Sequence, residues 1–384
     1  MRLRRTALLL ILLVGATAGA LAGEDETAQP GDPPTAVILT YHVVHSPTDS
    51  FYSMTREAFR EQMNYLLSTG YTVIPLEHLV EYASGRRESI PQQSVVITVD
   101  DGWKCTYTEI YPLMTELGFP FTVFIYPDFI GKSYYALQWP QIREMADAGV
   151  DIQSHTTTHP FLTKQDDAAL EKELAGSRAL LEKKVGKPIR YVAYPYGDYD
   201  GRVAEATQAA GYDAGLTCNF GEVRAGSDPF RMNRVVIYKE TSFASFRKLL
   251  GASELELADA MPAPSGTLDP HRPVIAARIA GFEGLDPESV QLALLGIGRL
   301  PYSYDPRDGS ISLVLREPLE EGTYSAAVWG TDRETGERRD AVWSFRLPEP
   351  MQSSGRVAST PRGGTAEAPP PSGSAVRGRS SHQK

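Results

Sequence analysis

The sequence predicts an α/β fold with a mostly parallel sheet, followed by a smaller all-β region. Between residues 36 and 238, short apolar runs rich in β-branched residues alternate with segments of helical periodicity. This alternation is typical of strand–helix–strand units, whose helices lie outside a sheet that is either open or closed into a barrel. After about residue 250, short strand-like runs follow one another without a convincing helix. The second part of the chain therefore predicts an immunoglobulin-like β-sandwich.

The elements of the first region are predicted from the spacing of apolar residues. Short apolar and β-branched runs indicate buried strands, whereas apolar residues three and four apart indicate helices, several of which end at a glycine. The predicted strands are residues 37–41, 94–99, 121–126, 150–153, 190–194, 214–217 and 234–238. The predicted helices are residues 57–68, 76–84, 109–117, 139–148, 168–185 and 202–210.

In the second region, turn residues separate the predicted strands. These strands are residues 274–279, 289–295, 311–315, 324–330 and 341–347. Asp305–Gly309 and Glu334–Gly336 are typical of turns, and Met261–Gly266 is typical of a linker. We therefore expect residues 270–348 to form one small domain, either a spacer or a module that binds a glycan or a partner.

Both ends of the chain are predicted to lie outside the folded domains. Three arginines precede an apolar run at residues 7–14, and small residues at 20 and 22 precede a polar stretch, which indicates a secretory signal of residues 1–22. The alternative is an uncleaved anchor, for which the run is short. Residues 349–384 are rich in Pro, Ser and Gly, which predicts a disordered tail. We expect a secreted protein, periplasmic or extracellular, with no stable membrane span after signal removal.

Composition narrows the class of partner. The 38 basic and 48 acidic residues give a net charge of −10, and the body of the chain holds no basic cluster. This argues against nucleic acid as a partner, because nucleic-acid binding relies on Lys and Arg side chains that neutralise phosphates. The two cysteines, Cys105 and Cys218, could form one disulfide in an exported protein or could both be free thiols. The sequence leaves that choice open.

Polar side chains follow four of the predicted strands, where functional residues of parallel α/β folds are usually found. In chain order they are His42, Asp100 with Asp101, His155 with His159, and the Pro-Tyr-Gly turn that contains Tyr196. Each of these groups alone has an ordinary explanation as a turn, a helix cap or a surface residue. Their joint occurrence at equivalent strand ends of one predicted sheet favours a functional site.

The residue types also fit together chemically. One carboxylate and two imidazoles form a ligand set suited to Zn²⁺ or a similar divalent ion. Adjacent aspartates on an extended chain point in opposite directions, so one can bind the metal while the other accepts a proton. A further histidine can protonate a leaving amine. The sequence therefore predicts a metal-dependent amide or ester hydrolase.

At these residues the sequence resembles the polysaccharide deacetylases with a NodB-homology domain. Thr98–Gly102 resembles the first motif of that family, Ser154–His159 the second and Ala193–Gly197 the third. The resemblance covers about residues 36–255 and implies a distorted (β/α) barrel. It also implies three groups of roles: Asp101, His155 and His159 would bind the metal, most commonly Zn²⁺, Asp100 would be the general base, and the backbone N–H of Tyr196 would stabilise the oxyanion.

Two departures from the family pattern affect the predicted site. The third motif usually begins with an Arg that supports the base, but Ala193 stands there, and Arg234 is a candidate replacement. The usual final motif with a catalytic His is missing from residues 235–255, whereas the run that ends in His42 has its character. This permuted arrangement is similar to the extracellular poly-N-acetylglucosamine deacetylases of biofilm matrix, and we assign His42 as the general acid.

The resemblance implies a secreted N-deacetylase of N-acetylglucosamine units in a polysaccharide, with poly-β-1,6-N-acetylglucosamine as the expected polymer. The alternatives are a peptidoglycan or chitin deacetylase, an O-acetyl xylan esterase, and a catalytically degenerate glycan-binding protein. Several aromatic residues near the site could stack on sugar rings or could simply pack against their neighbours. They are Trp103, Tyr134, Tyr135, Tyr196 and Tyr199.

Overall fold

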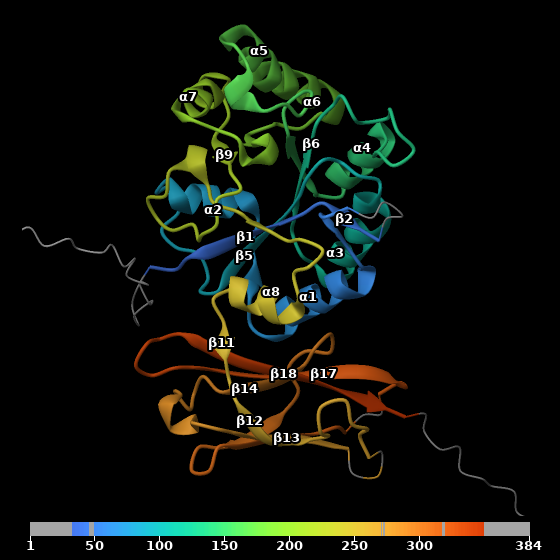
Figure 1. The fold of residues 1–384 in the computed structure, drawn as a ribbon, viewed down its shortest axis with the longest axis vertical. Helices are drawn as coiled ribbons and strands as arrows, with labels where there is room; N and C mark the ends of the chain where they lie inside the picture. Colours follow the sequence, from blue (N-terminus) through green and yellow to red (C-terminus); the bar gives the residue numbers. More distant parts are fainter. Residues whose placement is uncertain (1–32, 46–49, 270, 272, 317–318, 349–384) are drawn as a thin grey trace, which may run out of the picture. The chain divides into compact units, whose positions relative to one another are not determined.

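The structure is a computed structural model that describes residues 33–45, 50–269, 271, 273–316 and 319–348 (Figure 1). The predicted signal at residues 1–22 and the predicted tail at residues 349–384 lie outside the described residues. Among the described residues, no helix is long and apolar enough to cross a bilayer.

A parallel sheet forms the centre of the first region, which confirms the predicted α/β fold. Its strand order is β10-β1-β5-β6-β7-β8-β9, with β4 also paired to β5, and every pairing is parallel. The strands are β1 (Ala36–Tyr41), β4 (Thr72–Val73), β5 (Ser94–Val99), β6 (Thr122–Ile125), β7 (Asp151–Ser154), β8 (Tyr191–Ala193), β9 (Ala214–Leu216) and β10 (Val235–Val236). Two further strands, β2 (Val43–Val44) and β3 (Ser53–Met54), pair with each other.

One short segment brings the two ends of this sheet together. The backbone N–H of Met232 donates to the carbonyl of Gly215 at 3.0 Å, and the N–H of Thr217 donates to the carbonyl of Met232 at 2.9 Å. Met232 therefore pairs with the end of β9, and the chain then continues directly into β10, which pairs with β1. The sheet curves into an incomplete, distorted barrel, so the carboxyl ends of its strands face one shared centre.

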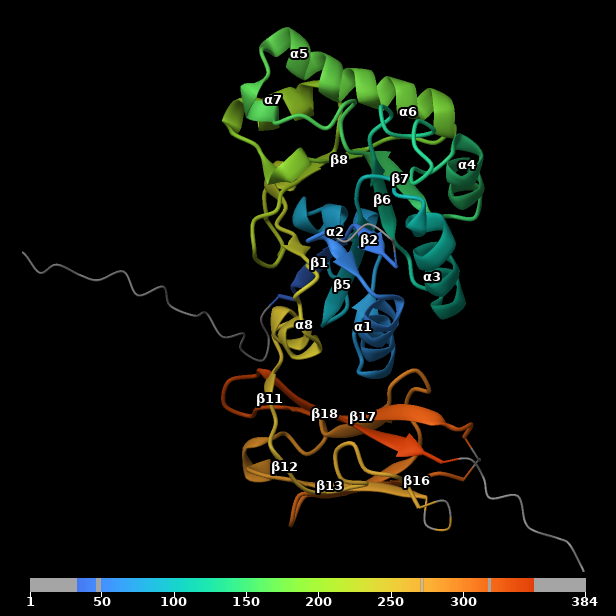
Figure 2. The ribbon, with the colours of Figure 1, turned by 45° about the vertical axis from the view of Figure 1, so that its right-hand side comes forward.

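Helices lie around the outside of the sheet (Figures 1 and 2). They are α1 (Arg56–Ser68), α2 (Leu76–Ala83), α3 (Tyr111–Leu117), α4 (Trp139–Asp147), α5 (Asp167–Glu171), α6 (Ser177–Val185), α7 (Gly201–Ala209) and α8 (Phe243–Leu249). The sequence analysis did not predict α8. A π-helical turn, Thr106–Ile110, precedes α3, and another, Lys172–Gly176, joins α5 to α6. The predicted helix 168–185 is therefore one long segment with an irregular turn inside it.

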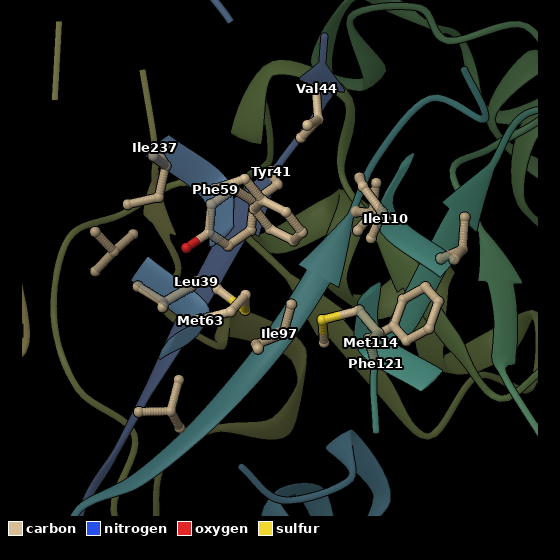
Figure 3. Close-up of a cluster of buried hydrophobic side chains, with 14 of the residues drawn as sticks. Leu39, Tyr41, Val44, Phe59, Met63, Ile97, Ile110, Met114, Phe121 and Ile237 are labelled. Carbon is tan, nitrogen blue, oxygen red and sulfur yellow. The ribbon is translucent and has the colours of Figure 1, made fainter. Parts of the chain in front are cut away.

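The main core lies between the sheet and the helices that pack on it (Figure 3). Leu39 of β1 and Ile97 of β5 are paired in register and fully buried. Phe59 and Met63 of α1 are also fully buried. Their spacing of four residues places them on one face of the helix, which explains why the apolar pattern of this segment predicted a helix.

The C-terminal strands form two four-stranded sheets around a second core. Their orders are β11-β18-β17-β14 and β12-β13-β16-β15. The strands are β11 (Ser253–Glu254), β12 (Leu257–Met261), β13 (Val274–Ile279), β14 (Gln291–Leu294), β15 (Tyr302–Asp305), β16 (Ser310–Val314), β17 (Gly322–Thr331) and β18 (Arg338–Leu347). Buried residues from both sheets, such as Ile275 and Phe345, belong to one cluster. The region is therefore a two-sheet sandwich.

Two of these strands correct the sequence analysis. β12 ends at Met261, which the sequence analysis placed in a linker, and β15 was not predicted. Both are edge strands, and none of their residues is fully buried. An edge strand with partly solvated faces lacks a strong apolar alternation, which is the signal that predicts strands. Because β11 and β12 pair with later strands, the sandwich includes residues before position 270.

Candidate metal centre

The parallel sheet brings three predicted ligands together at the carboxyl ends of its strands. Asp101 follows β5, whereas His155 and His159 follow β7, and one potential ligand atom from each lies within 4.8 Å of the others. The distance from His155 Nε2 to His159 Nε2 is 3.2 Å. Asp101 Oδ1 lies 3.6 Å from His155 Nε2 and 3.5 Å from His159 Nε2.

These spacings fit the tetrahedral coordination of a metal ion. Ligand atoms at about 2.0–2.1 Å from Zn²⁺ in tetrahedral geometry are separated from one another by roughly 3.3–3.4 Å. The three observed separations scatter around that value, so the residues need little movement to hold an ion. An Asp-His-His set also leaves a coordination position for water or substrate, as in catalytic rather than structural zinc sites.

Hydrogen bonds orient two of the three ligands. His155 Nδ1 lies 2.8 Å from the carbonyl oxygen of Ala193. Because a carbonyl can only accept, Nδ1 carries the proton and Nε2 keeps its lone pair for a metal. The indole N–H of Trp103 donates to Asp101 Oδ2 at 2.9 Å, which leaves Oδ1 toward the histidines. The sequence analysis treated Trp103 as an aromatic contact and missed this hydrogen bond.

Local backbone conformation at the site is unusual. Four of the eight non-glycine residues with positive φ in the described chain belong to it, namely Asp101 (φ 76°), Thr156 (φ 66°), His159 (φ 62°) and Tyr196 (φ 61°). Side chains other than glycine enter this left-handed region at an energetic cost, and such residues gather at functional sites. The surrounding contacts must therefore hold these loops in place.

Glu173 is the main such contact for the loop between the two histidines. Its Oε2 accepts hydrogen bonds from the backbone N–H groups of Thr157 and Thr158 at 2.8 and 2.9 Å, and its Oε1 accepts from the Thr158 hydroxyl at 2.6 Å. Glu173 lies in the π-helical turn and is largely buried. The sequence analysis missed it, because an acidic residue on an amphipathic helix resembles a surface charge.

Asp100 forms a buried ion pair with Arg234. The Arg234 Nη1–H donates to Asp100 at 2.9 Å, and its Nε–H donates to the carbonyl of Thr217 at 2.8 Å. Burial alone raises the pKa of Asp100, but Arg234 foremost, then His155 and His42, lower it, and its pKa lies below its ordinary value. Asp100 is therefore ionised at neutral pH.

His42 lies beside this group of charges. Burial lowers its pKa, and the negative charges of Asp100 and Asp101 oppose that shift. Its ring lies 4.7 Å from the ring of Tyr52, and its Nδ1 has no hydrogen-bond partner among the described residues. The structure thus places His42 near the carboxylates and holds it mainly by packing.

His159 and Tyr196 are neighbours on the other side of the cluster. Their ring centroids are 4.6 Å apart, and Tyr196 lies in the short 3₁₀ turn Pro195–Gly197 after β8. Burial, followed by the charge of His155, lowers the pKa of His159 to about 4. A neutral imidazole is the form that binds a metal ion.

The cysteines and the remaining aromatic residues can also be placed. Cys105 and Cys218 are free thiols, so they do not form the disulfide that the sequence left open. Tyr134 and Tyr135 are exposed, whereas Tyr199 stacks on a buried tyrosine at 5.6 Å. Of the five aromatic candidates, Tyr196 lies next to the predicted ligand His159, and Trp103 donates a hydrogen bond to the predicted ligand Asp101.

The parallel α/β fold presents an Asp-His-His cluster next to an ionised, arginine-paired carboxylate. This combination suits a hydrolase that uses a metal ion and a carboxylate base. The sequence profile described as polysaccharide deacetylase matches residues 87–215, which include Asp100, Asp101 and both histidine ligands. Residues 87–215 therefore lie in a polysaccharide deacetylase domain, which is a class of hydrolase.

Known proteins similar to this chain cover somewhat more than half of it. YxkH of Bacillus subtilis is 27% identical over 227 residues, 58% of this chain and 80% of that protein. A poly-β-1,6-N-acetyl-D-glucosamine N-deacetylase of Staphylococcus epidermidis is 25% identical over 263 residues, 60% of this chain and 90% of that protein. The solved structure of IcaB from Ammonifex degensii has a TM-score of 0.50 at 25% identity, covering 56% of this chain and 96% of that one.

Proposed function

We propose that the protein is a secreted, metal-dependent N-deacetylase that hydrolyses the acetamide of N-acetylglucosamine units, with poly-β-1,6-N-acetylglucosamine as its polymer. The observation that carries this proposal is the set formed by three pre-arranged ligands and the buried Asp100–Arg234 pair. The similar protein of Staphylococcus epidermidis, which is named for this polymer, supports the choice of polymer.

Asp101, His155 and His159 would hold the divalent ion, and Zn²⁺ suits their donor atoms and spacing. When bound, such an ion acts as a Lewis acid toward water and the acyl oxygen. The hydrogen bonds from Trp103 and to Ala193 keep the facing atoms of two ligands available for it.

Asp100 is the group that removes a proton from the attacking water. A general base must be ionised before the reaction, and Arg234 keeps it so. Arg234 is itself only 1% exposed and is held by the Thr217 carbonyl, so its position is fixed. In this role Arg234 takes the place of the arginine that the family usually carries where this chain has Ala193.

His42 and Tyr196 would act on the two atoms whose charge changes most. A backbone N–H at Tyr196 would donate to the acyl oxygen as negative charge develops there. His42 would donate a proton to the amide nitrogen as the C–N bond breaks. The atoms balance: water supplies an oxygen to the acyl carbon, the proton that Asp100 takes up replaces the one that His42 gives up, and the products are a free amine and acetic acid, which leaves as acetate and a proton.

The C-terminal sandwich supports a further structural assignment. We assign it to the immunoglobulin-like class, because the orders β12-β13-β16-β15 and β14-β17-β18 correspond to the ABED and CFG sheets of a constant-type domain. The sequence analysis placed the catalytic domain at residues 36–255. Because β11 (Ser253–Glu254) pairs with β18 of the sandwich, we propose residues 36–252 as the catalytic domain and the sandwich as an accessory domain. The proposed location of the protein is outside the cytoplasmic membrane.

Acetate release from a panel of acetylated polymers tests the proposal. The full chain, loaded with Zn²⁺, should release acetate from β-1,6-linked N-acetylglucosamine oligomers faster than from chitin, peptidoglycan or acetylated xylan fragments. A chelator should abolish the release, and added Zn²⁺ should restore it. Faster release from another polymer would replace the proposed substrate, and binding without any release would favour a degenerate glycan-binding protein.

A further inference from the structure

A hollow lies at the amino ends of three sheet strands, and we call it the amino-end hollow. Its volume is about 440 Å³, within the range of roughly 300–1,000 Å³ that is usual for small-ligand sites. The first residues of β6, β7 and β8 line it, namely Thr122, Asp151 and Tyr191. The predicted metal ligands instead follow the carboxyl ends of β5 and β7, so the hollow is separate from the proposed active site.

Strand register brings a group of polar side chains together at this hollow. Thr122 of β6 pairs with Asp151 of β7. Gln153 lies two residues after Asp151, so both side chains point to the same side of the sheet. The Thr122 hydroxyl and the Gln153 amide donate to the two Asp151 carboxylate oxygens at 2.9 and 2.6 Å. The backbone N–H of Tyr191 donates to Gln153 Oε1 at 2.9 Å, which connects β8 to the same group.

Asp151 is a partly buried carboxyl without a cation beside it. Its two hydrogen bonds come from neutral side chains, and no Lys, Arg or His of the described chain forms an ion pair with it. Arg190, which also lines the hollow, is bound by Glu77 and, at 2.6 Å, by Asp213. Burial is the largest influence on the pKa of Asp151 and raises it. A cationic ligand would supply the positive charge that this carboxylate lacks.

Tyr191 has a hydroxyl with unused hydrogen-bonding capacity. Its side chain is 2% exposed, and the hydroxyl has no hydrogen-bond partner among the described residues. Burial foremost raises its pKa, and the charges of Arg190, Asp151 and Glu77 also act on it. Those three residues line the hollow, so the hydroxyl lies among its lining groups. Because buried polar groups are nearly always hydrogen-bonded, this hydroxyl points to a further molecule that binds there.

The lining favours a small organic molecule that carries an ammonium group. Apolar side chains such as Pro75 and Phe121 suit the carbon skeleton of such a ligand. An ammonium has three donors and no acceptor, so it can donate to the Asp151 carboxylate and to the Tyr191 hydroxyl oxygen together. An anion would be repelled by Asp151. Lys187, the lining cation that no carboxylate of the described chain binds, is exposed to solvent.

We propose that the amino-end hollow binds the ammonium group of a small organic amine, with Asp151 and Tyr191 as its partners. The proposed deacetylation leaves free amino groups on sugar units, so an amino sugar is the amine that the protein itself would produce. Only this choice of amino sugar rests on the function proposed above. Because the hollow and the predicted metal ligands lie at opposite ends of the sheet, a bound amine would leave the proposed active site open.

Calorimetric titration of the Zn²⁺-loaded full chain with D-glucosamine near neutral pH tests the site. D-Glucose is the control ligand, since it has the same ring with a hydroxyl in place of the ammonium. We expect saturable binding of D-glucosamine and none of D-glucose at the same concentrations. Asp151→Asn should lower the affinity at least about tenfold through loss of the charge, and Tyr191→Phe about fivefold through loss of a hydrogen bond.

Three results would overturn the inference. They are the absence of saturable D-glucosamine binding, equally strong binding of D-glucose, and wild-type affinity for D-glucosamine in both variants. The last result would place the amine elsewhere on the protein.

Melting temperatures separate a binding role of Tyr191 from a structural one. Because its hydroxyl has no partner to lose, Tyr191→Phe should not lower the melting temperature of the unliganded protein. Tyr212→Phe is the matched control, since Tyr212 is also buried but its hydroxyl donates to the Leu174 carbonyl at 2.9 Å, outside the hollow. It should lower the melting temperature and keep wild-type affinity for D-glucosamine. An equal fall in Tyr191→Phe would show that its hydroxyl is bonded within the protein and would overturn the inference.

Acetate release distinguishes this inference from the proposed function. D-Glucosamine binding that both variants weaken, without acetate release from any substrate by the wild-type protein, would refute the hydrolysis and keep the amine site. Acetate release without such binding would refute the amine site alone.

Discussion

Replacing Arg234 by Met tests the proposed role of the buried ion pair. Arg234 and Asp100 are only 1% and 2% exposed, and their atoms meet at 2.9 Å. Removing one partner of a buried pair costs about 3–5 kcal/mol, because the remaining charge loses its compensation. A Coulomb term of about 4 kcal/mol for charges roughly 4 Å apart at an effective dielectric constant of 20 agrees with this range. We therefore expect Arg234→Met to lose about 3–5 kcal/mol of unfolding free energy at neutral pH.

Replacing Arg234 by Met should also alter how the free energy of unfolding and kcat/KM depend on pH. In the wild type the pKa of Asp100 lies below 3.8, so its ionisation stabilises the fold above that pH, and this contribution is lost as the pH falls through the folded-state pKa. Without Arg234, burial dominates and raises the pKa of Asp100. Protonation of Asp100 then removes its uncompensated buried charge. The difference in unfolding free energy between the variant and the wild type should therefore shrink as the pH falls. The acidic limb of kcat/KM should move to higher pH.

Urea unfolding across pH and acetate release across pH measure these two effects. The double variant Asp100→Asn/Arg234→Met is the control, since it removes both charges and should recover most of the lost stability without recovering activity. An Arg234→Met protein with wild-type stability and an unmoved acidic limb would refute the reasoning.

Three further predictions concern single side chains. His42→Ala should lower kcat about 10²- to 10⁴-fold with bound metal unchanged; loss of metal in step with activity would instead make His42 a structural residue. Glu173→Ala should weaken metal binding about 10- to 100-fold in a titration with a competing chelator, whereas Glu173→Gln, which keeps an acceptor, should weaken it less. Trp103→Phe keeps the ring but loses the donor to Asp101, so it should weaken metal binding about tenfold without lowering the melting temperature of the metal-free protein.

Much of the fold could be predicted because its strands are buried on both faces. Strand β5 is buried along its whole length, so the apolar run at residues 94–99 stands out in the sequence. β12 and β15 carry no such run, since they are edge strands of a sandwich with part of each strand in solvent. Their pairing depends on neighbours far along the chain, which local spacing does not reveal.

Some residues of the candidate site could likewise be predicted from the sequence, whereas others could not. Asp100, Asp101 and His155 could be found because each directly follows a predicted strand, and parallel strands end at one edge. Glu173 could not, since it reaches the histidine loop only through the π-helical turn, whose geometry leaves no mark in the sequence. Tertiary contacts of this kind connect residues of ordinary appearance to the site.

The central claim is that Asp100 acts as a base beside a metal held by its neighbours. Metal content and acetate release, measured on the same samples of wild-type and Asp100→Asn protein with β-1,6-linked N-acetylglucosamine pentamer, test it most directly. The account predicts one bound Zn²⁺ per chain in both proteins and a loss of at least about 100-fold in acetate release in the variant. Wild-type release by the variant, or wild-type protein that binds Zn²⁺ but releases no acetate, would contradict it.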